Sequence, residues 1–204
     1  MSIISAFFAA FMYVVFAQNL VFTGGYGISE SIRSAARPRQ LMLFSITIVF
    51  FSTITSFICR ILLFIPALKA ASITVSLVVY AIVLIEIFLI TIAVLRTALK
   101  GSSWTEEEKE IFFRQTAVAA FNTLVFVVPF INEKAACTVG ESIAQGFGAG
   151  IAFILATVFI HFGMKKIEAN PEIPESFKGI PALFMYIAIL SIAFTGFTGK
   201  ALFF

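Results

Sequence analysis

Polar residues interrupt long apolar stretches at a few points in this chain, and these residues could do chemistry inside a membrane. Gln18 and Asn19 end the apolar run from Ile3 to Ala17, and Asn132 ends a second run, from Ala117 to Ile131. Each run would form a helix about 22 Å long, whereas a helix needs about 20 residues to cross the hydrocarbon core. Short segments at matching positions in two halves of a chain indicate a site near the bilayer midplane.

The polar ends of these runs would place backbone groups at membrane depth. Such groups must line a cavity or be buried in protein, and the ends of half-helices can hold ions or anionic cofactor groups. We therefore predict that Asn19 and Asn132 belong to an ion path, with Gln18 at the first half-helix junction. The alternative is a shorter helix in a thinned bilayer, or a first helix that continues through Leu20 to Phe22.

Glu86 is a second kind of candidate, because it lies in the middle of the apolar segment from Val78 to Ile87. A carboxylate at that depth is costly and is a functional-site hypothesis by default. It could bind a cation or relay a proton. The alternative is a structural hydrogen bond to a neighbouring helix end or to Tyr80.

Cysteine chemistry is sparse. Cys59 and Cys137 form no CxxC pair and no complete set of metal ligands, so this chain alone cannot hold a four-cysteine cluster. The sequence also contains no nucleotide-binding loop, zinc-ligand spacing or Ser/His/Asp triad. The small residues Gly146 and Gly150, four positions apart, favour close packing of two helices.

Composition defines the elements that must position these residues. Of 204 residues, 60% are hydrophobic and 12% charged, and the mean hydropathy is +1.05, which is typical of a polytopic membrane protein. We expect one integral membrane domain, 1–204, in contact with the lipid bilayer and without a nucleic-acid partner. Met1 to Ala6 carries no Lys or Arg, so we expect a retained first helix and not a signal peptide.

The apolar stretches predict an all-α fold with six transmembrane helices. We place them at about 2–22, 41–64, 73–97, 116–131, 143–164 and 181–203. Three spans in each half require opposite insertion of the halves if they share a fold, which makes a 3+3 inverted repeat of about 1–100 and 101–204. Helices 1 and 4 are the short half-helices of that repeat. The pentapeptides Ile28–Ile32 and Val139–Ile143 are similar, each following a short helix.

Basic residues predict the orientation of the helices. Loops 1, 3 and 5 should be cytoplasmic and both termini outside, because cytoplasmic loops carry more Lys and Arg. The bases near loops 1, 3 and 5 are Arg33, Arg37, Arg39, Arg96, Lys100, Lys109, Arg114, Lys165, Lys166 and Lys178, against Arg60, Lys69, Lys134 and Lys200 on the opposite side.

Three motifs in the C-terminal third bring a known family into view. They are Gly140–Gly150 (GESIAQGFGAG), Pro174–Gly179 (PESFKG) and Ser191–Gly199 (SIAFTGFTG). Their order and composition resemble the RnfA/NqrE family of ion-translocating electron-transport subunits. The end of the first helix, Asn19 to Phe22, and Glu86 in the third helix are also similar to that family.

The resemblance implies a six-helix inverted-repeat subunit that pairs with a homologous membrane subunit of opposite topology. It further implies partners that carry flavins or iron–sulfur clusters. In the family, half-helices of the two subunits place four cysteines around an iron or iron–sulfur centre. An ungapped alignment puts Ser29 and Ala135 at the two cysteine positions of this chain, with Cys137 two residues away.

The sequence therefore predicts a multi-pass subunit, in a prokaryotic plasma (inner) membrane, of a complex that couples electron transfer to Na⁺ or H⁺ translocation. The chain would be part of a translocase, with Cys137 as its candidate metal ligand. The alternative is a small inverted-repeat secondary transporter, or a structural membrane subunit, without a redox centre or other cofactor.

Overall fold

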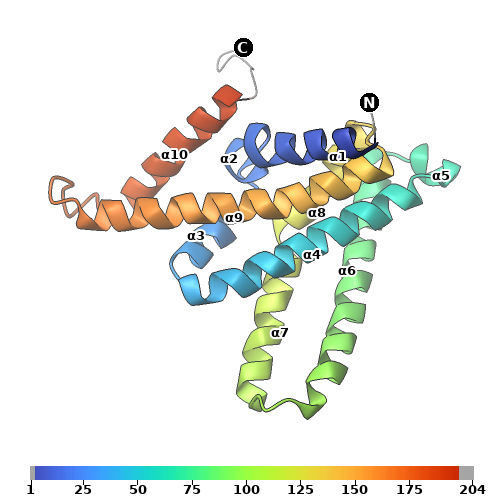
Figure 1. Ribbon diagram of the computed structural model, residues 1–204, viewed down its shortest axis with the longest axis horizontal. Coiled ribbons are helices and arrows are strands. Elements are labelled where there is room, and N and C mark those ends of the chain that lie inside the picture. The colour runs from blue at the N-terminus through green and yellow to red at the C-terminus, as the bar shows by residue number, and fades with distance from the viewer. Residues whose placement is uncertain (1–2, 198–204) are drawn as a thin grey trace.

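A computed structural model describes residues 3–197, and all of the secondary structure in that range is helical (Figure 1). The elements are α1 (Ile3–Met12), η1 (Tyr13–Ala17), α2 (Leu20–Gly24), α3 (Ile28–Ala35), α4 (Pro38–Leu62), α5 (Pro66–Lys69), α6 (Ile73–Ala98), η2 (Leu99–Gly101), α7 (Glu106–Ala120), α8 (Thr123–Lys134), α9 (Val139–Ala169) and α10 (Ile180–Phe197).

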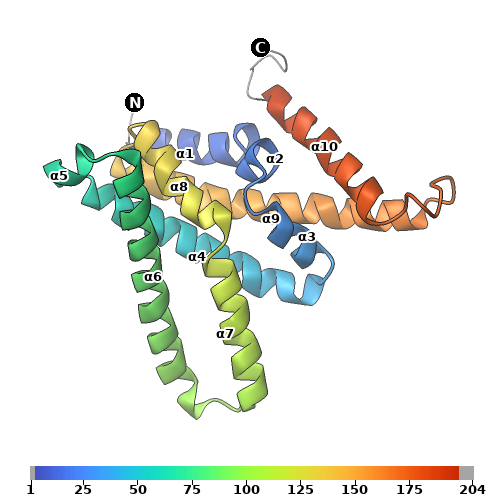
Figure 2. The same ribbon diagram turned by 180° about the vertical axis from the view of Figure 1, so that it is seen from behind.

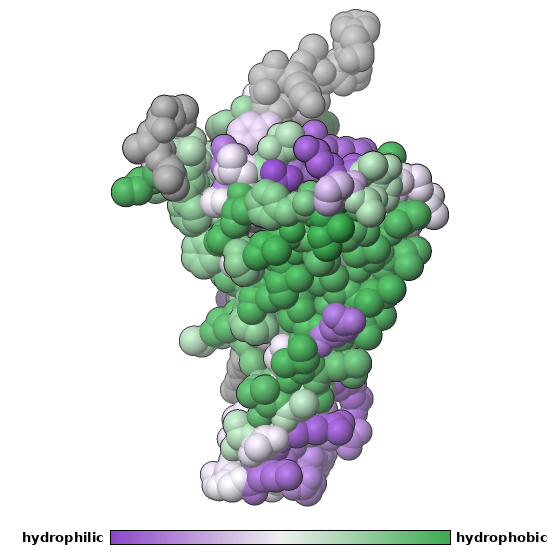
Figure 3. Space-filling model, turned by 90° about the vertical axis from the view of Figure 1, so that its right-hand side faces the viewer, coloured by the Kyte–Doolittle hydropathy of each residue, from purple (hydrophilic) through white to green (hydrophobic). Residues whose placement is uncertain are grey.

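The helices confirm a polytopic membrane protein with about six spans. Five segments are long and apolar enough to cross a bilayer, and a shorter apolar one precedes them. The five are Leu41–Leu62, Ile73–Gly101, Glu106–Lys134, Val139–Ala169 and Ile180–Phe197, and the shorter one is Ile4–Ala17. Figure 3 shows a broad hydrophobic band between hydrophilic surfaces at the two ends of the molecule.

Helices α4 and α9 run side by side through the centre of the molecule (Figures 1 and 2). Their contact depends on glycines, as the spacing of Gly146 and Gly150 predicts. A Cβ atom at Gly146 would lie 2.6 Å from the Ser52 carbonyl oxygen, and one at Gly150 would lie 2.6 Å from the Val49 Cα atom. The Ser52 hydroxyl also donates a hydrogen bond of 2.7 Å to the Gly146 carbonyl. The backbones of the two helices therefore touch.

The interrupted helix of each half packs on the long helix of the other half. Segments α1, η1 and α3 contact α9, while α7 and α8 contact α4. Helices α6 and α7 extend away from the central pair and are joined at their far end, whereas α10 leaves the end of α9 (Figure 2). Neither half therefore has a core made only of its own residues.

Several predicted boundaries are close to the observed ones. The segments predicted at 41–64 and 73–97 are α4 and α6. The predicted helix start near Thr105 is confirmed, because the Thr105 and Glu108 side chains form a reciprocal capping box at the start of α7. The end of the sixth predicted helix lies outside the described residues, as does Lys200.

Two predictions of local structure are wrong. The segment Gly24–Arg39 is not a loop throughout, because Ile28–Ala35 forms α3. The fourth helix is not an unbroken run that ends at Asn132, because it breaks at Phe121 and Asn122 and then continues to Lys134. The physical reason is the Asn122 side chain, which accepts a hydrogen bond from the Leu124 amide and so begins a new helix.

Candidate functional site

The first helix breaks at Gln18 and Asn19, as predicted. Its last turn is a π-helix, closed by a 2.7 Å bond from the Gln18 amide to the Tyr13 carbonyl. Asn19 is fully buried, and its Oδ1 accepts from the amides of Val21 and Phe22 at 3.1 and 3.4 Å. These two bonds begin α2 immediately after the break.

The other end of the Asn19 amide ties the break to α9. Its Nδ2 donates to the carbonyls of Val15 and Ala152, at 3.4 and 3.2 Å. An amide has two acceptor lone pairs and two donor hydrogens, so all four are used. Asn19 therefore holds the broken helix against α9 and has no free polar atom for an ion in this arrangement.

The second break is at Asn122, which the sequence analysis missed. Asn122 is 2% exposed, and its Oδ1 accepts from the Leu124 amide at 2.8 Å. Its Nδ2 has no hydrogen-bond partner among the described residues. The first and fourth helices thus break in the same way, at a buried asparagine that caps the following helix.

A local repeat in the sequence could have revealed the second break. Residues 17–22 read AQNLVF and residues 120–126 read AFNTLVF, which align on Asn19 and Asn122 with one inserted residue. The hydropathy pattern hides this repeat, because a single asparagine hardly lowers the mean hydropathy of an apolar stretch.

The two broken helices meet at Gly27. Its amide donates to the Thr123 Oγ1 at 2.9 Å, and its φ of 76° lies in the left-handed region that favours glycine. A Cβ atom at this position would lie 2.8 Å from the Asn122 Oδ1. The loop before α3 therefore sits on the start of α8, inside the protein.

Asn132 lies in the last turn of α8, where the sequence predicts a break. It is 1% exposed, and its Nδ2 donates to the Ser142 carbonyl at 3.4 Å. Among the described residues, its Oδ1 and the Ser142 hydroxyl are buried without a hydrogen-bond partner. Asn132 thus connects the end of α8 to the start of α9 and leaves one buried acceptor free, so its place on an ion path stays a prediction.

Glu133, next to Asn132, is held by α6. Its carboxylate accepts from the Tyr80 hydroxyl at 2.8 Å and from the Ser76 hydroxyl at 3.4 Å. Tyr80 is therefore not the partner of Glu86, and that alternative interpretation of Glu86 is wrong.

Glu86 lies on the outer face of α6. Its side chain is exposed and makes no hydrogen bond or ion pair within residues 3–197. The exposed apolar residues Ile82, Leu89 and Ile90 surround it at helical spacing. This places a carboxylate on an apolar surface in the middle of a candidate span.

The chain is similar to membrane subunits of two kinds of complex. It is 35% identical, over 78 residues, to a subunit of the ion-translocating oxidoreductase complex of Colwellia psychrerythraea, which is 38% of this chain and 40% of that protein. It is 28% identical, over 96 residues, to a subunit of the Na(+)-translocating NADH-quinone reductase of Hahella chejuensis, which is 41% of this chain and 47% of that protein. No family model matches.

These relatives confirm the resemblance to the RnfA/NqrE family. The matched part is less than half of the length of either relative.

The positions aligned with the cysteines of the RnfA/NqrE family do not converge in this chain. Ser29 is exposed in the first turn of α3, two residues after Gly27, which contacts the start of α8. Ala135 is also exposed and follows the far end of α8, about 18 Å from Thr123 at 1.5 Å per residue.

Cys137 does not supply a ligand at either position. It is 5% exposed, and its Sγ accepts a hydrogen bond from the Gln145 Nε2 at 3.1 Å. Burial, and after it the Glu141 carboxylate, raise the pKa of the Cys137 thiol, whereas metal binding needs the thiolate. Over residues 3–197, no group of three or more His, Cys, Asp or Glu could hold a metal ion. The donor set of this chain does not fit its share of an iron–sulfur centre.

Proposed function

We propose that this chain is a membrane subunit of an ion-translocating oxidoreductase complex of the Rnf/Nqr type, which couples electron transfer to Na⁺ or H⁺ translocation. The similarity to membrane subunits of such complexes supports this assignment. The single observation that carries it is Glu86, an unpaired carboxylate on the outer face of the most apolar candidate span.

The position of Glu86 needs a partner. A carboxylate at the centre of a bilayer costs about 3 kcal/mol when it faces lipid, and this chain supplies no cation or donor for it within the residues that the structure describes. A second membrane subunit on this face of α6 would exclude lipid and leave a polar route for a cation or a proton. We infer that the partner is a homologous subunit of opposite topology, in a complex with flavin- or iron–sulfur-bearing subunits.

We further propose that residues of about 1–100 and 101–204 form an inverted repeat. The two asparagine-capped breaks support it, as does the exchange of packing in which α1 and α3 contact α9 while α7 and α8 contact α4. In such a repeat, Asn19 and Asn122 occupy equivalent positions near the bilayer midplane.

The Glu86→Gln variant tests the proposed function in the native complex. We expect ion uptake driven by electron transfer into inverted membrane vesicles to fall about tenfold or more, because glutamine cannot carry the charge or the proton. The partner subunits should still purify with the tagged chain, because Glu86 makes no contact that holds this chain together.

Glu107→Gln is the matched control, because Glu107 is an exposed carboxylate in the first turn of α7. It should leave ion uptake unchanged. Full ion uptake in the Glu86→Gln complex would remove Glu86 from the ion path. Purification of the chain without any redox subunit would contradict the proposal as a whole.

A second candidate function is an inverted-repeat carrier without redox chemistry, and the missing thiolates at Ser29 and Ala135 favour it. The same purification separates the two candidates, because a carrier has no flavin- or iron–sulfur-bearing partners. Iron analysis of the purified complex, before and after removal of this chain, tests whether a centre depends on it.

The proposed orientation has its own test. We expect Glu107→Cys and Glu172→Cys to react with an impermeant maleimide from the cytoplasmic side and Lys69→Cys from the opposite side, because bases gather in cytoplasmic loops. All three positions are exposed, while the native Cys59 and Cys137 are buried, so the wild-type chain is the unlabelled control. Labelling of Glu107→Cys and Glu172→Cys from opposite sides would contradict this topology.

A further inference from the structure

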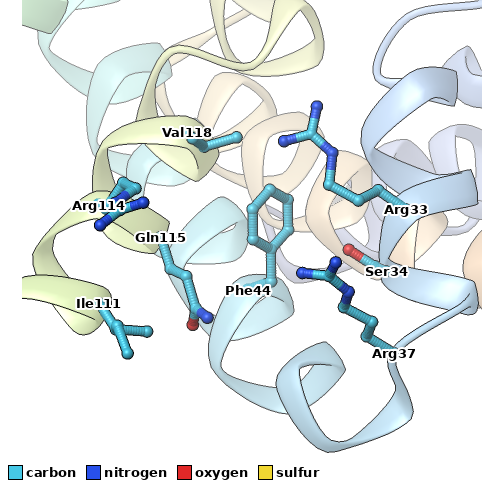
Figure 4. A pocket seen from close by; sticks show the side chains of 8 residues that line it. All are labelled: Arg33, Ser34, Arg37, Phe44, Ile111, Arg114, Gln115 and Val118. Carbon is cyan, nitrogen blue, oxygen red and sulfur yellow. The ribbon is translucent and has the colours of Figure 1, made fainter. Parts of the chain in front are cut away.

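A cavity of about 340 Å³ lies between α3, the start of α4 and α7 (Figure 4). Three guanidinium groups line it, from Arg33, Arg37 and Arg114. Figure 4 shows Arg33 and Arg37 on one wall, reaching toward Phe44, and Arg114 on the facing wall. Two separate parts of the chain thus bring positive charge to one cavity.

The carboxylates near this cavity compensate the charge only weakly. Glu30 lies 3.7 Å from Arg33, and Glu110 lies 3.7 Å from Arg114. Both arginine side chains are more than half exposed, so these ion pairs contribute little. Arg37 has no ion-pair partner among the described residues. The cavity therefore keeps a positive charge that an anion could neutralise.

The rest of the lining is apolar. Phe44, which is buried, forms the floor together with Ile111 and Val118. Phe44 lies in the first turn of the apolar segment Leu41–Leu62, and Ile111 lies near the start of the segment Glu106–Lys134. The guanidinium groups are thus at the level where the spans begin, beside an apolar surface that belongs within the bilayer.

We propose that this cavity binds the phosphate of an anionic phospholipid headgroup. Arginine binds phosphate oxygens with two parallel hydrogen bonds, and basic pockets between membrane helices are suited to anionic headgroups. A soluble phosphate ester would offer the same phosphate, but it would leave Phe44, Ile111 and Val118 without an apolar group to contact. The acyl chains of a phospholipid supply that group.

Trp104 is a built-in reporter for this site, because it is the one tryptophan in the sequence. It lines a neighbouring hollow together with Ile111 and Gln115, both of which also line the cavity. Bromine atoms on lipid acyl chains quench tryptophan fluorescence at contact. Quenching of Trp104 therefore measures which lipid occupies this part of the surface.

The experiment reconstitutes the full chain with brominated phosphatidylglycerol or brominated phosphatidylcholine at equal mole fractions. We expect phosphatidylglycerol to be preferred about fivefold or more, because each arginine near an anionic headgroup favours it. The double variant Arg37→Gln/Arg114→Gln should lose this preference. Lys165→Gln/Lys166→Gln removes two exposed charges elsewhere on the same predicted side and should keep it.

Each outcome decides the assignment. Equal preference in all three proteins would overturn the site, since it would reflect general surface charge. Displacement of brominated phosphatidylglycerol by millimolar glycerol phosphate would assign the cavity to a soluble phosphate ester and overturn the lipid. Arg37→Gln alone removes an exposed, unpaired side chain and so leaves the fold intact, and it should lower the preference by about half on a logarithmic scale.

Discussion

Replacing Gly146 with alanine should lower the free energy of unfolding by about 3 kcal/mol, because the added methyl group has no space. Its carbon would lie 2.6 Å from the Ser52 carbonyl oxygen and 2.8 Å from the Thr53 Cα atom. Both are backbone atoms, so no side chain can move aside, and α4 and α9 must separate. The change would also displace the hydrogen bond from the Ser52 hydroxyl to the Gly146 carbonyl.

Gly140 is the matched control for Gly146. It lies in the same helix, and a Cβ atom there would meet no other atom within 4 Å. Alanine at Gly140 should stabilise the protein by up to about 1 kcal/mol, because alanine is the better helix former. Unfolding of both variants in a titration with a denaturing detergent measures the difference. Equal stability of the two variants would show that α4 and α9 do not touch at Gly146.

Replacing Asn19 with alanine should also destabilise the protein by about 3 kcal/mol, through buried backbone groups left without partners. The variant removes the acceptor for the Val21 and Phe22 amides and the donor to the Ala152 carbonyl. Without these bonds, neither the start of α2 nor its attachment to α9 is held.

Asn170→Ala is the same chemical change at the other extreme of burial. The Asn170 side chain accepts one hydrogen bond, from the exposed Glu172 amide, in the loop after α9. We expect it to cost less than about 1 kcal/mol, since water can replace that bond. The same detergent titration compares the variants, and protease sensitivity near α2 reports local loosening. If Asn19→Ala were as stable as Asn170→Ala, Asn19 would not hold the break.

Hydropathy alone could predict α4 and α6, because each is a long apolar stretch with polar residues at both ends. It could also predict the break at Asn19, where two polar residues adjoin. It placed the second break wrongly at Asn132, because the polar residues of a helix end and those of an internal break lower the hydropathy in the same way. Only the side-chain bond from Asn122 to the Leu124 amide distinguishes them.

The candidate site was predicted in part, for a related reason. Glu86 stood out because a lone carboxylate in an apolar helix is rare, and the structure shows that it faces outward. Position along a helix could not tell whether another helix of the chain covers it, since that depends on packing between distant segments. The contact of Gly27 with Thr123 is likewise a product of tertiary structure, between residues 96 positions apart.

The partner of Asn19 also has a consequence for biosynthesis. The Ala152 carbonyl lies 133 positions later in the chain, so α1 leaves the ribosome and enters the bilayer well before α9 exists. During that interval the amide of Asn19 has no native acceptor and must be shielded by water, lipid headgroups or an insertion factor. Ribosome stalling before α9 emerges should therefore leave the N-terminal segment near the membrane surface, and release of the stall should draw it inward.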